Sequence, residues 1–376
     1  MATFAIGSAV VTVARSDDGD GNPTGSPSPN VTASPTPTCA PTWEVVPSAD
    51  PGEAPTTLLG VVAVTATEGW AVGGIGIPGA PTAVAIQRWD GTTWSAAEGP
   101  SPGTTANELL AVDASGPNDV WAVGRTSSGS GDDPLVLHFD GTEWSQVAVT
   151  EEIGGVLTGV AAIAPTDVWA VGYVGDPAAS LERALVLHWD GSAWAVVEIG
   201  RAIGGGKAAL LDIGWVSETD LWAVGYHHFQ PLILRFDGSE WSRSPTEVRG
   251  TTNGVEPFAT GEVWTVGEPI QRFDGTAWTA AEIVRPGAEL VDIAAVGAAD
   301  IWAVGSRPAR IANTLRAAVY RYTGRRWAPV DGPGVAGSEA LTAVDALPDG
   351  TVFAVGSKDV ELERRTLAIV GTSCPA

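Results

Sequence analysis

Ten charged or imidazole side chains are the candidates for ligand binding or chemistry in this sequence: Arg125, Asp132, Asp133, Asp176, Arg183, Lys207, His227, His228, Arg307 and Lys358. Two carboxylates could flank a glycosidic bond as acid and nucleophile or base, and adjacent histidines could ligate a metal. However, the sequence contains no nucleophile elbow, no zinc-spaced His/Cys set and no phosphate-binding glycine loop. We therefore predict a ligand-binding surface and no catalytic residues.

The elements that must position these residues come from one unit that recurs seven times. Trp-Ala-Val-Gly or a close variant begins at Trp70, Trp121, Trp169, Trp222, Trp264, Trp302 and Phe353. In the second copy, four β-prone stretches lie between turn residues: Leu109–Ala114, Val120–Gly124, Leu135–Phe139 and Trp144–Val149. A period of about 40–50 residues built from short strands is typical of a β-propeller. We predict an all-β, seven-bladed propeller with four antiparallel strands in each blade.

Two kinds of repeated side chain are expected to support the fold. A tryptophan that recurs once in each blade is predicted to pack as a wedge between neighbouring sheets rather than to stack on a ligand. An arginine or histidine stands two residues before the turn Asp of the Asp-Gly-x-x-Trp motif, at Arg88, His138, His188, Arg235 and Arg272. Because His138 and His188 belong to this repeat, we expect them to be structural rather than catalytic.

The seventh copy ends before its fourth strand. It offers Ala340–Leu347, Thr351–Gly356 and Thr366–Gly371, whereas residues 42–47 near the start of the chain read like a fourth strand. Cys39 precedes Trp43 by the offset that separates the turn Asp from its Trp in the other copies, and Cys374 lies at the other half of that turn. We predict a last blade of three strands plus one and a Cys39–Cys374 disulfide, with two unrelated buried thiols as the alternative.

Loop lengths distinguish the two faces of such a ring. Links between second and third strands vary from residues 268–269 in the fifth copy to Arg125–Pro134 in the second and Tyr173–Ala184 in the third. Links between blades, such as Glu198–Lys207, vary as well. Both sets emerge on one face of a propeller, and loops on a rigid scaffold commonly determine binding specificity. We place the ligand site there, around the mouth of the channel.

Carboxylates on the innermost strands raise the question of a metal. They occur in two columns of the repeat, at Asp113, Asp212, Glu256, Asp292 and Asp345. They could hold a cation near the channel, but hydrogen bonds to neighbouring strands are the use we favour. Asp18–Asn22 begins like a calcium loop, yet Pro23 and Pro29 replace its glycine and glutamate. We predict no cofactor, since no complete motif supports Ca²⁺.

Composition limits the partners and the compartment. The net charge of −24 argues against nucleic acid and anionic membranes as partners. We divide the chain into an apolar segment at 1–14, a Pro/Ser/Thr-rich linker at 15–38 and a propeller at 39–376. The first segment would be the remnant of a signal peptide or membrane tether, or a frayed terminus. A disulfide would imply an extracellular, cell-surface or periplasmic protein, and we expect a monomer.

The repeat also resembles a known family. Asp-Val-Trp-Ala-Val-Gly at 167–172 and His-Trp-Asp-Gly-Ser-Ala-Trp at 188–194 are similar to repeats of bacterial secreted seven-bladed propellers, which are grouped with kelch, YVTN and BNR-like propellers. The resemblance covers residues 39–376 and implies the fold, but the fold alone does not imply an activity. We expect a non-enzymatic scaffold that binds a protein or glycan through its variable loops. The alternative is a glycan-active hydrolase or lyase that uses loop carboxylates on the same face.

Overall fold

A computed structural model describes residues 42–50, 54–76, 79–129, 131–149, 153–175, 182–281, 283, 287–309, 314–332, 337–360 and 363–373. One compact unit spans Ala40–Ala376. The predictions for residues 1–14 and 15–38, for Asp176, and for the disulfide between Cys39 and Cys374 lie outside the described residues. Within the described part of the chain, no helix is long and apolar enough to cross a membrane.

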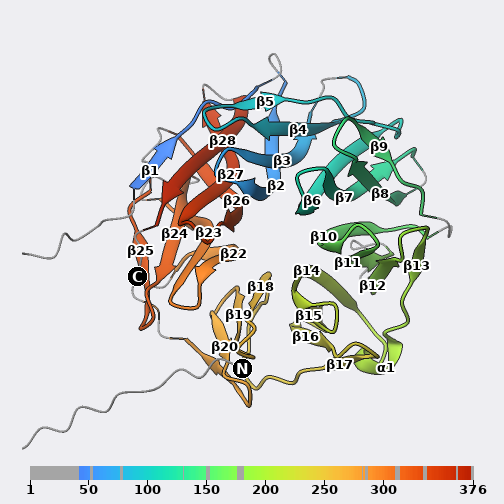
Figure 1. The fold of residues 1–376 in the computed structure, drawn as a ribbon, viewed down its shortest axis with the longest axis vertical. Helices are drawn as coiled ribbons and strands as arrows, with labels where there is room; N and C mark the ends of the chain where they lie inside the picture. Colours follow the sequence, from blue (N-terminus) through green and yellow to red (C-terminus); the bar gives the residue numbers. More distant parts are fainter. Residues whose placement is uncertain are drawn as a thin grey trace, which may run out of the picture. The chain divides into compact units, whose positions relative to one another are not determined.

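The described chain forms seven antiparallel sheets of four strands each, arranged as the blades of a ring (Figure 1). From the innermost strand outward, blade 1 contains β2 (Thr56–Thr65), β3 (Glu68–Ile75), β4 (Ala83–Trp89) and β5 (Trp94–Ala96), and blade 2 contains β6 (Ala106–Gly116), β7 (Asp119–Ser127), β8 (Asp132–Phe139) and β9 (Trp144–Gln146). Blade 3 contains β10 (Val156–Ala164), β11 (Asp167–Val174), β12 (Arg183–Trp189) and β13 (Trp194–Val196). Blade 4 contains β14 (Ala208–Ser217), β15 (Asp220–His227), β16 (Gln230–Phe236) and β17 (Trp241–Arg243).

Blade 5 contains β18 (Gly254–Pro257), β19 (Val263–Val266), β20 (Gln271–Phe273) and β21 (Trp278–Ala280). Blade 6 contains β22 (Glu289–Gly297), β23 (Asp300–Pro308), β24 (Leu315–Tyr322) and β25 (Trp327–Val330). Blade 7 contains β26 (Glu339–Ala346), β27 (Thr351–Val360), β28 (Glu363–Thr372) and β1 (Thr42–Val45). In the last sheet β1 pairs with β28, with Thr42 opposite Thr372 and Val45 opposite Ile369. The described chain is therefore an all-β propeller of seven four-stranded blades, as the repeat predicts.

Strand ends in blade 2 differ from the sequence prediction on the side of the long link. The segment Arg125–Pro134 was expected to be a loop, but the ladder between β7 and β8 continues until Ser127 pairs with Asp132. The placement of Arg125, Asp132 and Asp133 in a loop was therefore wrong, since all three are strand residues. The pattern of apolar residues in β7 and β8 ends before the strand pairing does, because these positions lie beyond the hydrophobic core. The link Glu198–Lys207 also contains a short helix, α1 (Gly200–Ile203), that we did not predict.

The glycine of Trp-Ala-Val-Gly is required by a bulge in the innermost strand. In blade 3, the pairing of β10 with β11 shifts register between Leu157 and Gly159, opposite Gly172. A Cβ on Gly172 would collide with the carbonyl oxygen of Val156. The bulge therefore pushes the neighbouring backbone against this position, and only glycine leaves room for it.

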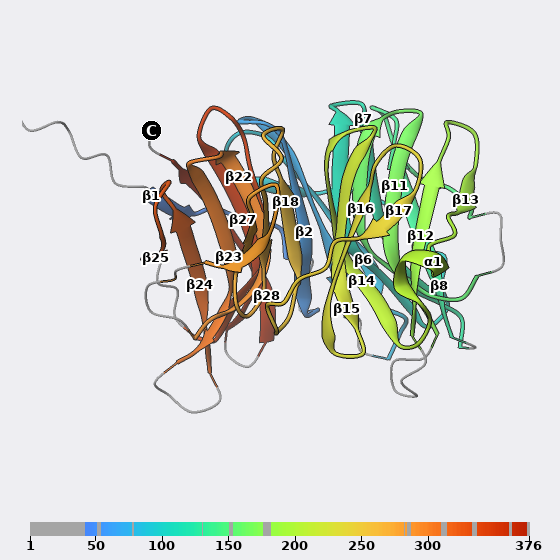
Figure 2. The same cartoon turned by 90° about the horizontal axis from the view of Figure 1, so that it is seen from below.

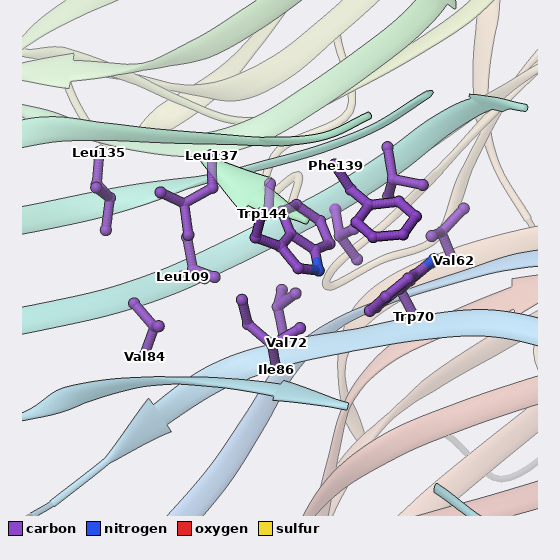
Figure 3. Packing of buried hydrophobic residues seen from close by; sticks show 13 residues of the cluster. Val62, Trp70, Val72, Val84, Ile86, Leu109, Leu135, Leu137, Phe139 and Trp144 are labelled. Atoms are coloured by element: carbon purple, nitrogen blue, oxygen red, sulfur yellow. The ribbon is translucent and has the colours of Figure 1, made fainter. Parts of the chain in front are cut away.

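Tryptophans pack between neighbouring blades, as predicted. Trp70 of blade 1 meets Trp144 of blade 2 edge to face, with ring centroids 5.2 Å apart and planes at 86° (Figure 3). The same T-shaped contact joins Trp121 to Trp194, Trp169 to Trp241, Trp222 to Trp278, Trp264 to Trp327, Trp302 to Trp43 and Phe353 to Trp94. Each second-strand aromatic thus packs against the fourth-strand tryptophan of the next blade. This edge-to-face geometry favours aromatic pairs beyond their buried area.

The repeated Arg or His also has a structural role. In blade 2, the indole N–H of Trp121 donates to Asp119 Oδ1 at 3.1 Å, and His138 Nε2 lies 2.7 Å from the same oxygen. The rings of His138 and Trp121 stack with centroids 4.2 Å apart. His188 repeats the arrangement with Asp167 and Trp169 in blade 3. The expectation that both histidines support the scaffold is confirmed.

Candidate functional site

The strands run between two ends of the ring (Figure 2). We call the end that carries the links between second and third strands and the links between blades the variable-loop face. The other end, the short-turn face, carries turns such as residues 140–143. In that turn Asp140 Oδ1 accepts the N–H groups of Thr142 and Glu143. Hydrogen bonds from Thr142 and Glu143 lower the pKa of Asp140 to about 2, so the short turns are built to be rigid.

On the variable-loop face, an ion-pair cluster forms where three strands of blade 2 end. Arg125 Nε lies 3.1 Å from Glu108 Oε2, and Arg125 NH1 lies 3.1 Å from Asp132 Oδ2. Tyr173 of blade 3 borders this cluster: burial raises the pKa of its phenol, and the Arg125 charge opposes that rise. The cluster thus joins three strands of blade 2 through one guanidinium, whose charge also acts on Tyr173 of blade 3.

A second ion pair joins blade 3 to blade 4 on the same face. Lys207 Nζ lies 3.2 Å from Glu182 Oε1, and the Tyr226 hydroxyl donates to that oxygen at 3.2 Å. Burial pushes the pKa of Glu182 upward, but hydrogen bonds from its own backbone, Lys207 and Tyr226 outweigh burial and leave it below the usual value. Burial and the nearby Glu182 carboxylate raise the pKa of Tyr226 to about 12. Glu182 is only 2% exposed, and its Oε2 has no hydrogen-bond partner among the described residues.

An aromatic side chain projects from the hairpin between β15 and β16. The two turn residues, His228 and Phe229, have φ values of 49° and 62°, a left-handed conformation that is unfavourable for residues with a Cβ. Phe229 is 73% exposed, and Lys207 Nζ lies 4.7 Å from the centre of its ring. The turn therefore holds a large apolar group in solvent beside a cation, at the expense of backbone strain.

The remaining predicted residues lie on other parts of this face. Asp133, Arg183, His228 and Arg307 are exposed, and Lys358 lies opposite Glu339 in the ladder of blade 7. His227 Nε2 lies 2.8 Å from the Gly205 carbonyl oxygen and its Nδ1 lies 3.4 Å from Arg243 NH1. Both ring nitrogens of His227 are thus engaged, and the described residues contain no group of three or more His, Cys, Asp or Glu that could hold a metal.

Of the ten predicted residues, the structure places three in two ion-pair clusters: Arg125 and Asp132 in blade 2, and Lys207 between blades 3 and 4. Sequence reasoning missed five residues in or beside these clusters: Glu108, Tyr173, Glu182, Tyr226 and Phe229. Tyr173 and Tyr226 directly follow Trp-Ala-Val-Gly, so their place at the end of a second strand could have been inferred from the repeat. Glu182 could not have been, because a link of variable length precedes it.

Among the described residues, the carboxylates of these two clusters are each paired with a cation. Glu108 and Asp132 share one guanidinium, and Glu182 is held by an ammonium group.

Inside the ring, the innermost strands enclose a cavity of roughly 380 Å³. Asp113 of blade 2 accepts the backbone N–H of Ala114 at one oxygen and that of Ala162, in blade 3, at the other, both at 2.8 Å. The same bridge to the next blade is made by Asp212 to Val255, Asp292 to Val344 and Asp345 to Ala63. The aspartates therefore join neighbouring blades, which is the use we favoured from the sequence.

Burial shifts the titration of these aspartates. Desolvation, the main cause, raises the pKa of Asp113 and Asp345 to about 7, of Asp212 to about 6 and of Asp292 to about 8, and neighbouring carboxylates add to the rise. The backbone N–H groups oppose it, since they stabilise the charged form. Burial thus makes these carboxyls harder to ionise than free ones.

Comparison with known proteins supports the fold. No protein-family model and no curated protein matches the sequence. The solved structure of YCF48 bound to D1 peptide is 16% identical with a TM-score of 0.59, covering 89% of this chain and 97% of its own. Streptogramin B lyase is 13% identical with a TM-score of 0.58, covering 88% and 97%. The GH74 xyloglucanase from Xanthomonas campestris is 13% identical with a TM-score of 0.56, covering 87% of this chain and 55% of its own. Likeness at these identities shows the propeller fold alone.

Proposed function

We propose that this chain is a binding module that holds a polypeptide segment against the variable-loop face, over blades 2, 3 and 4. The observation that carries the proposal is Phe229, a 73% exposed aromatic on a turn whose two residues both have positive φ. Strain of this kind persists where the surrounding structure maintains it, and it is concentrated at functional sites. An exposed aromatic next to a cation is also the type of group that anchors protein interfaces.

The neighbouring ion pairs suit a polypeptide ligand. The guanidinium of Arg125 and the ammonium of Lys207 could donate to ligand carboxylates, while Glu108 and Asp132 could accept N–H groups or basic side chains. A propeller of this fold has been solved with a peptide bound, as the YCF48 structure states, which makes the same use plausible for this chain.

The cellular setting forms part of the proposal. We propose that the ring is closed by the pairing of β1 with β28 together with a Cys39–Cys374 disulfide, which would require an oxidising compartment. The protein would then be a bacterial extracellular, cell-surface or periplasmic monomer, carried on the 15–38 linker and tethered to the membrane through its N-terminal segment. Mass spectrometry of the unreduced protein after proteolysis tests the disulfide: a peptide pair joined through Cys39 and Cys374 supports it, and two free thiols refute it.

A display library of random peptides tests the binding function. Immobilised protein should enrich peptides that bind wild type and lose at least about tenfold in affinity on Phe229→Ala and on Lys207→Met, since a central anchor contributes roughly 2 kcal/mol or more. Leu315→Ala is the matched control, because Leu315 is a 40% exposed apolar residue next to the equivalent link of blade 6. Peptides that bind all three variants equally, or no enrichment, would overturn the proposal. Enrichment of glycans instead, on a parallel glycan array, would assign the face to carbohydrate.

A further inference from the structure

Five acidic residues line the channel cavity, and they have no basic counterpart there. Among the described residues that line it, Asp113, Asp212, Glu256, Asp292 and Asp345 are acidic, and none is a lysine, arginine or histidine. Four of the five are explained by the fold, since they accept backbone N–H groups from their own blade and the next. Glu256 is not explained in this way.

Glu256 differs from the acidic residues that hold the same ladder position in other blades. It occupies the ladder position of Asp113 and Asp345, opposite the second-strand aromatic of its blade. Those aspartates accept the N–H of the next residue, but the residue after Glu256 is Pro257, which has no N–H. Within the described part of the chain its carboxyl has no hydrogen-bond partner, and desolvation, followed by the charges of Asp345, Asp212 and Asp292, raises its pKa well above the usual value. Glu256 is therefore a half-buried acid in the channel with no hydrogen-bond partner among the described residues.

Trp215 also differs from the residues at its ladder position in other blades, and it lines the same cavity. It stands opposite Leu221 in blade 4, at a ladder position that holds alanine in five other blades: Ala63, Ala114, Ala162, Ala295 and Ala346. Unlike the tryptophans that pack between blades, Trp215 is 38% exposed. It lines the cavity together with Asp113 and Glu256. The fold does not need a tryptophan here.

We propose that the channel cavity binds an organic ammonium ion, which contacts the indole of Trp215 and takes Glu256 and Asp113 as its counter-charges. Aromatic rings combined with carboxylates recognise ammonium groups through cation–π and Coulomb attraction. A metal ion fits less well, because the described residues contain no group of three or more ligands that could hold one. The cavity volume, roughly 380 Å³, lies in the range of about 300–1,000 Å³ that is typical of small-molecule sites.

Choline and its neutral isostere 3,3-dimethyl-1-butanol provide the direct test, by titration calorimetry on the full chain at about pH 8. Choline should bind saturably and the isostere should not, because the two have similar shapes and only choline is charged. Trp215→Ala, which restores the residue that five blades carry, and Glu256→Gln should each weaken choline binding by roughly tenfold or more. Glu240→Gln, at an exposed carboxylate of the short-turn face, should leave binding unchanged.

Protonation supplies an independent readout. A bound cation lowers the pKa of the surrounding carboxyls, so choline binding should release protons and strengthen from about pH 6 to about pH 8. Equal binding of the isostere, wild-type affinity in Trp215→Ala, or no choline binding at about 10 mM would each overturn the proposal. Calcium binding without choline binding would also overturn it. These outcomes are independent of the peptide experiment, which concerns the variable-loop face.

Discussion

Lowering the pH should stabilise this protein over a range in which many proteins change little. Asp113 and Asp345 have pKa values of about 7 in the folded state, against 3.8 for a free carboxyl. Because the folded state binds these protons more tightly than the unfolded chain, its stability is greatest below the unfolded pKa and is lost as the pH rises through the folded pKa. The unfolding free energy should therefore fall between about pH 5 and about pH 8.

The size of the effect follows from the shift. One pKa unit corresponds to about 1.36 kcal/mol, so a carboxyl of pKa about 7 loses about 2–3 kcal/mol between about pH 5 and pH 8. Asp113 and Asp345 are partly accessible through the channel, and screening by water reduces this to about 1 kcal/mol each. Asp212 and Asp292, whose pKa values are also raised, change stability in the same direction.

Urea unfolding at several pH values, followed by tryptophan fluorescence, measures the effect. Asp345→Asn separates the two roles of that side chain. Its amide cannot accept both the Ala346 and Ala63 N–H groups, so the variant should be less stable at every pH. It should also show a smaller loss of stability toward pH 8, because one titrating group is gone. An unfolding free energy that is constant or rises from pH 5 to pH 8, or an unchanged slope in the variant, would refute the reasoning.

Three further outcomes are expected in the same urea assay. Trp327→Ala, at a fully buried wedge against Trp264, should cost about 3–5 kcal/mol, and a loss below about 1 kcal/mol would contradict the wedge role. Gly172→Ala should cost more than about 2 kcal/mol, since its Cβ would meet the Val156 carbonyl; near-wild-type stability would contradict the bulge argument. Asp140, whose pKa is lowered to about 2, contributes stability that is lost as the pH falls through about 4 to 2. In Asp140→Asn, the unfolding free energy should therefore fall less steeply as the pH is lowered below about 4. An unchanged fall would contradict the stabilising role of Asp140.

The sequence predicts the blades well because each blade repeats the same local solution. The glycine of Trp-Ala-Val-Gly and the second-strand aromatic each satisfy one packing requirement that recurs in every blade, and the turn Asp satisfies a hydrogen-bonding requirement in five of them. The number of blades, the strand order and the structural role of His138 could be inferred from this repetition. Strand ends on the variable-loop face could not, because the polar residues there carry no apolar pattern although they continue the ladder.

The candidate site was less predictable, since it depends on residues that depart from the repeat. Lys207 and Glu182 come from different blades, and only the folded ring brings them within 3.2 Å. The exposure of Phe229 depends on a two-residue turn that the sequence does not mark with Asn or Gly, the residues preferred there. Trp215 was visible as the exception in an alanine column, but its column could be aligned only once the ladder pairings were known.

Hydrogen–deuterium exchange is the measurement that tests the peptide-binding account most directly. Exchange would be compared for the free protein and for its complex with a peptide selected on wild type. The account predicts slowed exchange on the variable-loop face of blades 2 to 4, around Arg125 and at the His228–Phe229 turn, with no change at the short turns such as residues 140–143. Protection confined to the short-turn face, or spread evenly over all seven blades, would contradict it.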